Sequence, residues 1–310
     1  MKNLPCYNYK REGGMEMDKI LRNRKVICLL LLPAVILFTC TVAVPLAWSF
    51  YYSMFNWNGV SKMKFTGLDN YIKLFSDQNF ITSFKNNILF MIVNVIGQVG
   101  IALLVAILLT CIGKGRNLFK TIYFVPTILS AVALAQFFQK FYGLEPVGVL
   151  NALLEAVGLG DMQRAWLGDS ATAMGSVIVI ECYKSMPLYM VILYSGLLSI
   201  PDDVIDAARV DGAYGWKLFA SIKLPYLYSV LTVTLVMAVN GLLKAFDVPF
   251  ITTYGGPGRS TELVATYMYK VAFASTKYGY ASTIAVFLVV ESVLLVSVLR
   301  KFMSGRKSAV

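Results

Sequence analysis

Apolar residues gather in six long runs along this chain, and shorter polar segments separate them. The runs cover about residues 26–52, 86–112, 118–140, 173–196, 226–250 and 281–302. Each run supplies the ~20 mostly apolar residues that an α-helix needs to cross a hydrocarbon layer about 30 Å thick. A backbone in lipid must satisfy its own hydrogen bonds, which favours helices over open strands. The pattern therefore predicts an all-α polytopic membrane protein with six transmembrane helices.

The composition agrees with this class. The chain has 310 residues, of which 57% are hydrophobic and 15% are charged. In a soluble domain about a quarter of the residues are charged. A net charge of +11 would also suit a nucleic-acid-binding protein. However, lysines and arginines stand mainly at the ends of the apolar runs, with no nucleic-acid motif between them. We attribute the charge to topology and to contact with membrane lipid, and expect no nucleic-acid partner.

The same charges predict an orientation. With a cytoplasmic N-terminus, the cytoplasmic segments carry 17 lysines and arginines and the external loops carry 8, in agreement with the positive-inside rule. We expect a basic cytoplasmic tail (1–25), a transmembrane domain (26–302) and a second cytoplasmic tail (303–310). The first apolar run is too long for a cleaved signal peptide, so it is predicted to remain as the first span.

The residue inventory excludes several kinds of enzyme. The chain has no histidine, which removes histidine general bases, histidine-containing triads and HExxH zinc sites. Its five cysteines have no metal-ligand spacing, so we expect free thiols and no bound metal. Gly113-Lys114 lacks the other residues of a phosphate-binding GxxxxGK[ST] loop. We therefore predict no catalytic residue and no cofactor on this chain. If ATP is used, another chain hydrolyses it.

The polar segment 200–225 separates the fourth and fifth runs and is predicted to form a helical hairpin. Ser199 is a candidate N-cap for its first helix, and Gly212 is a candidate for the left-handed residue that ends it. A second helix is expected over about 215–222, and Pro225 is expected to stop it. Such a hairpin at a membrane surface suits insertion into a partner protein.

The hairpin contains seven residues at a characteristic spacing: Asp206, Ala207, Ala208, Gly212, Ile222, Leu224 and Pro225. This spacing closely resembles the Glu-Ala-Ala loop of the membrane permeases in binding-protein-dependent ABC importers, although Asp206 replaces the usual Glu. In that family the loop holds the coupling helix, which docks in a cleft of the ATPase subunit. An ordinary cytoplasmic loop helix would explain any two of these features but not the full spacing. The resemblance implies that the seven residues couple this chain to an ATPase.

Three other segments are similar to the carbohydrate (oligosaccharide) permeases of the maltose type. They are Phe65 to Tyr71, with a GLxNY pattern; Phe246-Asp247 followed by Thr252 to Gly258; and Tyr278 to Ser282. Together with the hairpin, the resemblance runs from about residue 26 to 302. It implies that Gly255, Gly256 and Pro257 close an outer gate and contact an external solute-binding protein.

Polar residues inside the spans are candidates for the solute pathway, because charges at membrane depth are costly unless they face a cavity or a partner. The candidates are Thr127, Ser130, Glu181, Lys184, Asn240, Lys244 and Asp247. Glu181 and Lys184 lie three residues apart, so they either pair with each other or line a hydrated path with Tyr183 and Ser185. Asn240, Lys244 and Asp247 have the spacing of one helical stripe. The two lysines would also suit an acidic solute.

An external helix is expected near residues 148–154, followed by Trp166 at the level of the lipid headgroups. This element is either a simple interfacial anchor or part of the surface that receives the binding protein.

The resemblance implies a permease that moves an oligosaccharide or related polyol across the cytoplasmic membrane of a bacterium by alternating access. Its implied partners are a second related permease subunit, two ATPase subunits that hold ATP and Mg, and an extracellular solute-binding protein. Alternatives are an ion-coupled secondary transporter, an ABC permease for a non-sugar solute, and a membrane enzyme. A secondary transporter would usually show an internal repeat, and the hairpin has no counterpart in the first half of the chain.

Overall fold

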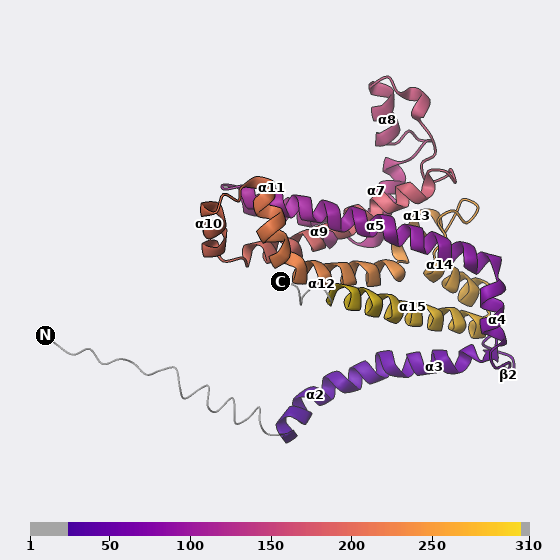
Figure 1. Cartoon of the computed structure of the whole chain (residues 1–310). Helices are drawn as coiled ribbons and strands as arrows, with labels where there is room; N and C mark the ends of the chain where they lie inside the picture. Colours follow the sequence, from indigo (N-terminus) through magenta and orange to yellow (C-terminus); the bar gives the residue numbers. More distant parts are fainter. Residues whose placement is uncertain (1–23, 305–310) are drawn as a thin grey trace.

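The computed structural model describes residues 24–304, and most of this part is helical (Figure 1). The predicted tails fall outside the described residues, except for 24–25 and 303–304 at their inner ends. The helices are α2 (Arg24–Phe38), α3 (Val44–Ser53), α4 (Asp69–Ser76), α5 (Gln78–Cys111), α6 (Arg116–Ile128), α7 (Ala131–Phe141), α8 (Val149–Ala156), α9 (Ala173–Leu198), α10 (Asp202–Val210), α11 (Gly215–Leu218), α12 (Leu224–Leu243), α13 (Asp247–Thr253), α14 (Val264–Tyr269) and α15 (Tyr278–Ser304).

Short irregular elements join these helices. They are three π-helical segments, η1 (Thr39–Ala43), η3 (Phe219–Lys223) and η4 (Lys270–Ala274); one 3-10 turn, η2 (Gly160–Met162); and two strands, β1 (Phe55–Asn56) and β2 (Lys64–Phe65). The strands pair antiparallel and form a small hairpin after the first span.

The predicted all-α membrane fold is confirmed. Five helical stretches of the described chain are long and apolar enough to cross a membrane: Lys25–Ser53, Gln78–Cys111, Ala173–Leu198, Gly215–Thr253 and Tyr278–Met303. The sixth predicted span, 118–140, is the pair α6 and α7, which meet at a bend of 96°. The bend arises because Leu129 and Ser130 are extended, and the Ser130 hydroxyl then accepts a hydrogen bond from the Ala133 amide to start α7.

One proline position differs from the expectation, and a second proline is accommodated in the same way. The prediction that Pro225 stops a helix is wrong, because α11, η3 and α12 form one continuous stretch. Proline removes one backbone donor and crowds the carbonyl four residues earlier. A π-helical segment ends two residues before Pro225, and another ends two residues before Pro45. In both places the wider turn lets the helix continue past the proline.

The start of the first hairpin helix also differs. Ser199 is not its N-cap; the Ser199 hydroxyl donates to the Gly196 carbonyl at 2.7 Å and belongs to the end of α9. Proline disfavours a helical conformation at the residue before it, which here is Ile200. Pro201 is itself extended, so α10 begins only at Asp202.

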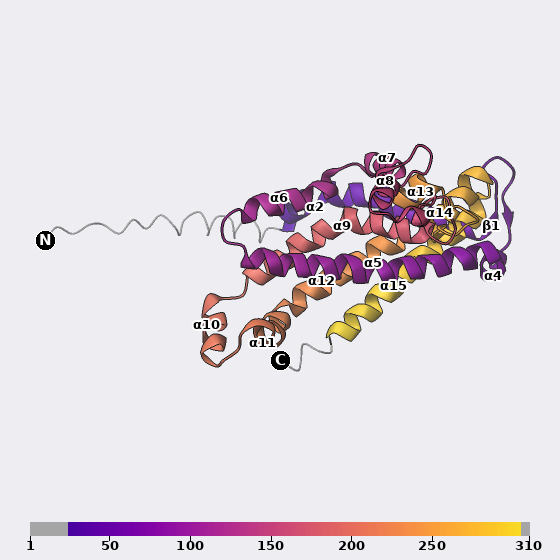
Figure 2. The same cartoon turned by 90° about the horizontal axis from the view of Figure 1, so that it is seen from above.

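The bundle is centred on α5, α9 and α12, with α15 beside α12 (Figures 1 and 2). Gly196 lets α9 and α12 approach closely, because a Cβ there would lie 2.8 Å from Leu227 Cδ1. Buried polar side chains of α5, namely Asn87, Asn94 and Gln98, line its contact with the rest of the bundle. Gln98 donates to the Glu181 carbonyl of α9 at 3.3 Å, which ties these helices together at membrane depth.

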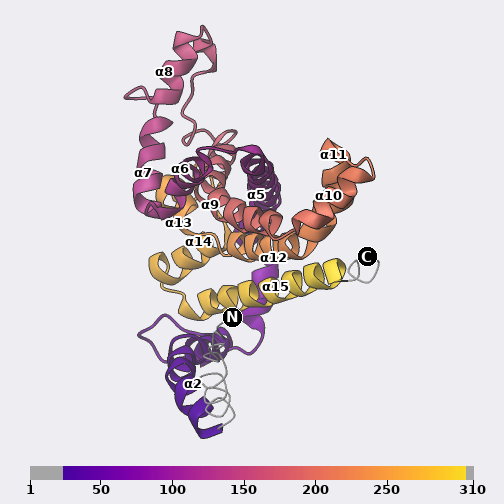
Figure 3. The ribbon, with the colours of Figure 1, turned by 90° about the vertical axis from the view of Figure 1, so that its left-hand side faces the viewer.

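The two ends of the bundle carry different elements. The helices α10 and α11 stand at one end, and the β-hairpin, α4, α13 and α14 gather at the other (Figures 1 and 2). Two parts project sideways from the bundle in opposite directions: α2 on one side, and the arm of α7 and α8 on the other (Figure 3). Because the two ends lie on opposite sides of the spans, they would face opposite sides of a membrane.

Candidate functional site

The hairpin of residues 200–225 has a small core of its own. Ala208, Ala213 and Leu218 are buried together, and Ile205 and Ile222 pack against them. Small side chains at the first two positions let α10 lie close to α11. Gly212 ends α10 with a φ of 78°, a conformation that glycine adopts at little cost. The hairpin is therefore a defined structural unit at one end of the bundle, and its second helix continues into the fifth span.

Three large apolar side chains are exposed on the surface of this hairpin. Val210 is 88% exposed, Trp216 is 77% exposed and Tyr214 is 65% exposed. One ion pair accompanies them, between Asp206 and Arg209 at 2.9 Å. Large exposed apolar side chains that cluster on a protruding element mark an interaction site. Val210 and Tyr214 were not predicted, because neither belongs to the motif and their exposure is set by the fold.

The structure separates the seven predicted coupling residues by exposure: Ala208 is buried, Ile222 and Leu224 are partly buried, and Asp206, Ala207, Gly212 and Pro225 are exposed. The motif therefore combines residues that build the hairpin with residues that are available to a partner.

The predicted pathway residues form two groups. In the first, Glu181 and Lys184 pair at 3.8 Å, Ser185 donates to Glu181 at 2.9 Å, and Thr127 donates to the Lys184 carbonyl at 3.0 Å. Of the two open interpretations, pairing between Glu181 and Lys184 is thus present in the structure. Ser130 has the separate task of capping α7.

The second group comprises Asn240, Lys244 and Asp247, all of which are exposed. They do not share one continuous helix, since α12 ends at Leu243 and Asp247 begins α13. Lys244 lines a cavity of about 400 Å³ together with Phe246 and residues of α14 and α15. Within residues 24–304, no hydrogen bond or ion pair joins this group to the first.

A row of aromatic rings lies beside the second group. Phe246 stacks on Phe250 with centroids 4.6 Å apart, and Phe250 lies 4.8 Å from Tyr254 and 4.9 Å from Tyr269. Tyr269 continues the row to Phe273 at 4.8 Å. This row was not predicted from the sequence, although the four-residue spacing of residues 246, 250 and 254 is a local signal for it.

The predicted gate segment is a tightly held turn. Tyr254 ends α13 with a φ of 52°, and Gly255 follows with a φ of 76°. A Cβ at Gly255 would lie 3.1 Å from Lys270 Nζ and 3.2 Å from the Glu262 side chain, so glycine is needed here. The Thr261 hydroxyl donates to the Gly256 carbonyl at 2.8 Å and fixes the far side of the turn.

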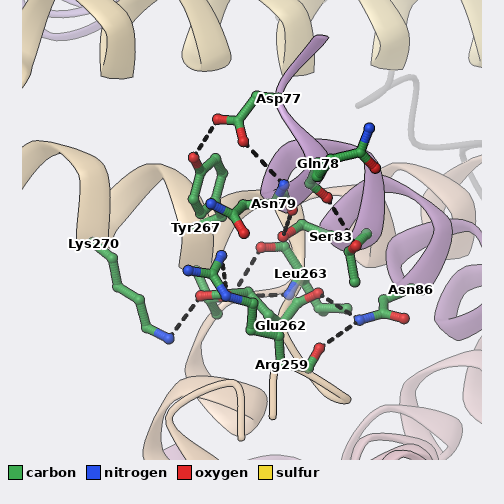
Figure 4. A network of polar contacts seen from close by, with 12 residues as sticks. Asp77, Gln78, Asn79, Ser83, Asn86, Arg259, Glu262, Leu263, Tyr267 and Lys270 are labelled. Carbon is green, nitrogen blue, oxygen red and sulfur yellow. Dashed lines mark hydrogen bonds and ion pairs between the residues drawn. The ribbon is translucent and has the colours of Figure 1, made fainter. Parts of the chain in front are cut away.

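A network of charged and polar side chains lies behind this turn (Figure 4). Glu262 is 1% exposed and contacts Lys270 at 2.6 Å and Arg259 at 3.4 Å.

Asp77 caps α5 and accepts hydrogen bonds from Tyr267 at 2.5 Å and from Tyr280 at 2.8 Å. Burial tends to raise the pKa of Asp77, but these hydrogen bonds outweigh it and hold the pKa below its ordinary value. Burial and the bond to Asp77 raise the pKa of Tyr267.

The lateral arm is held by its own polar contacts. Asn151 of α8 is buried and donates to the carbonyls of Gly143 at 2.8 Å and Arg164 at 3.1 Å. The Trp166 indole N–H donates to Asn151 at 2.8 Å. The indole N–H is therefore satisfied inside the arm, and the position of Trp166 at the level of the lipid headgroups stays a prediction.

Comparisons with known proteins give the family. Residues 101–308 match the family described as the binding-protein-dependent transport system inner membrane component. The probable ABC transporter permease protein YurN of Bacillus subtilis (strain 168) is 35% identical over 290 residues, which cover 92% of this chain and 99% of YurN. The multiple sugar-binding transport system permease protein MsmF of Streptococcus mutans serotype c (strain ATCC 700610 / UA159) is 31% identical over 259 residues, which cover 81% of this chain and 87% of MsmF.

A solved structure shares the fold. The crystal structure of a bacterial ABC transporter involved in the import of the acidic polysaccharide alginate contains a chain that matches with a TM-score of 0.80 at 21% identity, covering 93% of this chain and 98% of that one. Members of the matched family are multi-pass subunits of the inner membrane that work with a solute-binding protein and are not themselves catalytic. The chain is a permease of an ABC importer and belongs to the binding-protein-dependent transport system inner membrane component family.

Proposed function

We propose that this permease carries an oligosaccharide or a related sugar across the cytoplasmic membrane by alternating access. The observation that carries the proposal is the aromatic row from Phe246 to Phe273 beside the exposed polar groups of Lys244 and Asp247. Sugars present apolar C–H faces that stack on aromatic rings, and hydroxyl edges that need hydrogen-bond donors and acceptors. Binding sites of this kind combine aromatic walls with a few placed polar groups.

Two relatives support a sugar substrate by their names. MsmF belongs to a multiple sugar-binding transport system, and AmyD of Thermoanaerobacterium thermosulfurigenes is a probable permease for starch degradation products. AmyD is 26% identical over 274 residues, which cover 87% of this chain and 91% of AmyD. Both proteins match this chain over most of its length, and the family match over residues 101–308 includes the region of the aromatic row.

We further propose that ATP hydrolysis on separate subunits drives the cycle through the hairpin. The support is the exposed surface of Val210, Tyr214 and Trp216 next to Asp206 and Ala207. In the proposed complex this chain pairs with a second related permease and two ATPase subunits, which hold ATP and Mg. The two termini and the hairpin then lie in the cytoplasm, and the β-hairpin, α4 and the gate turn lie outside.

Uptake by the reconstituted transporter tests the sugar proposal. The complete complex, purified with its own partners, is placed in lipid vesicles containing ATP, and the loaded binding protein is added outside with labelled neutral and uronic oligosaccharides. We expect ATP-dependent accumulation of at least one saccharide, and a loss of about tenfold in Tyr269→Ala, since stacking on an aromatic ring contributes roughly 1–2 kcal/mol.

A tyrosine of similar exposure outside the row provides the matched control. Tyr123 on α6 is 43% exposed and Tyr269 is 37% exposed, so Tyr123→Ala should reduce uptake less than twofold. Equal effects of the two substitutions would contradict the assigned pathway. Solute accumulation without ATP would instead favour a secondary transporter.

A further inference from the structure

A charged pocket opens at the end of the bundle opposite the hairpin. It has a volume of about 470 Å³ and lies among α4, the start of α5, the loop after α13, the segment α14–η4 and the start of α15. Figure 4 shows the contacts of four of its charged residues, Asp77, Arg259, Glu262 and Lys270. We call it the cation pocket and define it by six charged residues: Lys73, Asp77, Arg259, Glu262, Lys270 and Lys277. Nothing in the proposed transport cycle assigns a role to these charges.

The pocket has more positive than negative groups. Its two carboxylates are already engaged: Glu262 by Lys270 and Arg259, and Asp77 by two tyrosine hydroxyls. Lys73 and Lys277 are exposed, and neither forms an ion pair with any residue in the described range 24–304. Four cationic and two acidic groups leave an excess of two positive charges around one cavity. The cavity therefore favours an anion.

Two of the four cations, Arg259 and Lys270, are held in place before any ligand arrives. Asn86 donates to the carbonyls of Arg259 at 2.9 Å and Glu262 at 3.1 Å, which fixes the loop that carries both residues. Lys270 donates to the Tyr254 carbonyl at 2.7 Å, and the Arg259 guanidinium lies 6.0 Å from the centre of the Tyr267 ring. Preorganised donors lose little entropy on binding, so a carboxylate that enters the pocket gains most of the interaction.

We propose that the cation pocket receives a carboxylate side chain of the solute-binding protein when that protein docks on the external face. This inference rests on the orientation given under the proposed function. The pocket shares Tyr254 and the loop to Glu262 with the gate turn, so a docked protein that reaches Gly255 to Pro257 also reaches the pocket.

The walls favour a protein carboxylate over a lipid headgroup. Apart from the tyrosines, the apolar side chains that line the pocket in the described part of the chain are Val271 and Ala274. An anionic lipid needs an apolar path for its acyl chains beside the charged site, and these two side chains are too few to form one. A side chain that approaches from the aqueous side needs no such path.

Charge reversal in the complete transporter tests the proposal. The double variant Lys73→Glu/Lys277→Glu removes the unpaired cations and leaves the pairs of Glu262 intact. The matched control, Lys62→Glu/Lys64→Glu, makes the same charge change at two exposed lysines near the β-hairpin on the same end. The measurement is the Kd of the transporter's own binding protein for the complex in nanodiscs, at several salt concentrations.

We expect the Kd to rise at least about tenfold in the pocket variant and less than about threefold in the control, because surface charges beyond a Debye length of about 8 Å are screened at physiological salt. The salt dependence of the Kd should weaken in the pocket variant only. Replacing one acidic residue of the binding protein by lysine should then restore affinity toward the pocket variant.

Each other outcome has a defined meaning. Equal Kd values for the pocket variant and the control would overturn the proposal. A difference that is present in nanodiscs with phosphatidylglycerol and absent in pure phosphatidylcholine would assign the pocket to a lipid phosphate and would also overturn it. A wild-type complex that binds no binding protein would contradict the proposed function itself and not the choice of pocket.

Discussion

The two ends of this permease use charge in opposite ways. At the hairpin, the pair of Asp206 and Arg209 lies on the surface, with side-chain exposures of 68% and 52%. At the cation pocket, Glu262 is 1% exposed and bridges two cations. The hairpin is held by a small apolar core and displays apolar side chains, whereas the opposite end adds polar contacts between distant segments to a larger apolar cluster. The difference fits the proposed roles of the two ends: a docking element at the hairpin and a fixed frame, held by long-range contacts, at the other end.

The largest expected effect is a loss of coupling at the hairpin. Ala207 is exposed on α10, so Ala207→Asp leaves the hairpin core intact but places a charge in the proposed ATPase interface. A desolvated and unpaired charge opposes docking strongly, so we expect ATP-driven uptake to fall to background. Ala207→Ser keeps the size and the neutrality and should retain uptake within about twofold of wild type. Normal uptake by a correctly inserted Ala207→Asp variant would contradict the assignment of this hairpin as the element that couples the permease to the ATPase.

A pair of neutralising substitutions compares the two ends directly. Glu262→Gln keeps the side-chain shape but leaves Lys270 and Arg259 without their counter-charge in a partly buried site. We expect a loss of about 2 kcal/mol in the free energy of unfolding, less than for fully buried pairs because both cations keep some solvent contact. Asp206→Asn breaks an exposed pair and should cost less than about 0.5 kcal/mol. The Tm of the purified permease in detergent measures both changes, and similar shifts would remove the distinction between the ends.

The sequence predicts the hairpin end well because its signals are local. The seven motif residues lie within 20 positions, and the six apolar runs follow from composition over single segments. The two wrong predictions at this end concern Ser199, which was expected to cap a helix, and Pro225, which was expected to stop one. The Ser199 hydroxyl bonds backward into α9, and a π-helical segment lets the chain pass Pro225. Neither outcome leaves a signal in the residues themselves.

The opposite end could not be predicted in the same way because its contacts are distant in sequence. Asp77 meets tyrosines that lie 190 and 203 positions away, and Asn86 bonds a carbonyl 173 positions away. Nothing near Asp77 in the sequence indicates those partners. The aromatic row is an intermediate case, since Phe246 and Phe250 are local neighbours but Tyr269 joins them only through the fold. Sequence reasoning therefore found the segments of the candidate pathway and missed how they assemble.

The smallest expected effect is a pH dependence that belongs to the fixed end alone. Because the folded-state pKa of Asp77 lies below its ordinary value of 3.8, its ionised form stabilises the native state. That stability is fully present above pH 3.8 and is lost as the pH falls through the lower folded-state pKa. Asp77→Asn should lower the Tm at pH 6 by a few degrees, which corresponds to a loss of roughly 1 kcal/mol in the free energy of unfolding. The difference in Tm between this variant and the wild type should become smaller toward pH 3. Asp206→Asn, at the other end, should show no such convergence. A Tm difference from wild type that stayed constant for Asp77→Asn between pH 6 and pH 3 would contradict this prediction. It would mean that the charge of the Asp77 carboxylate, which caps α5 and binds the two tyrosines, does not contribute to the stability of this end.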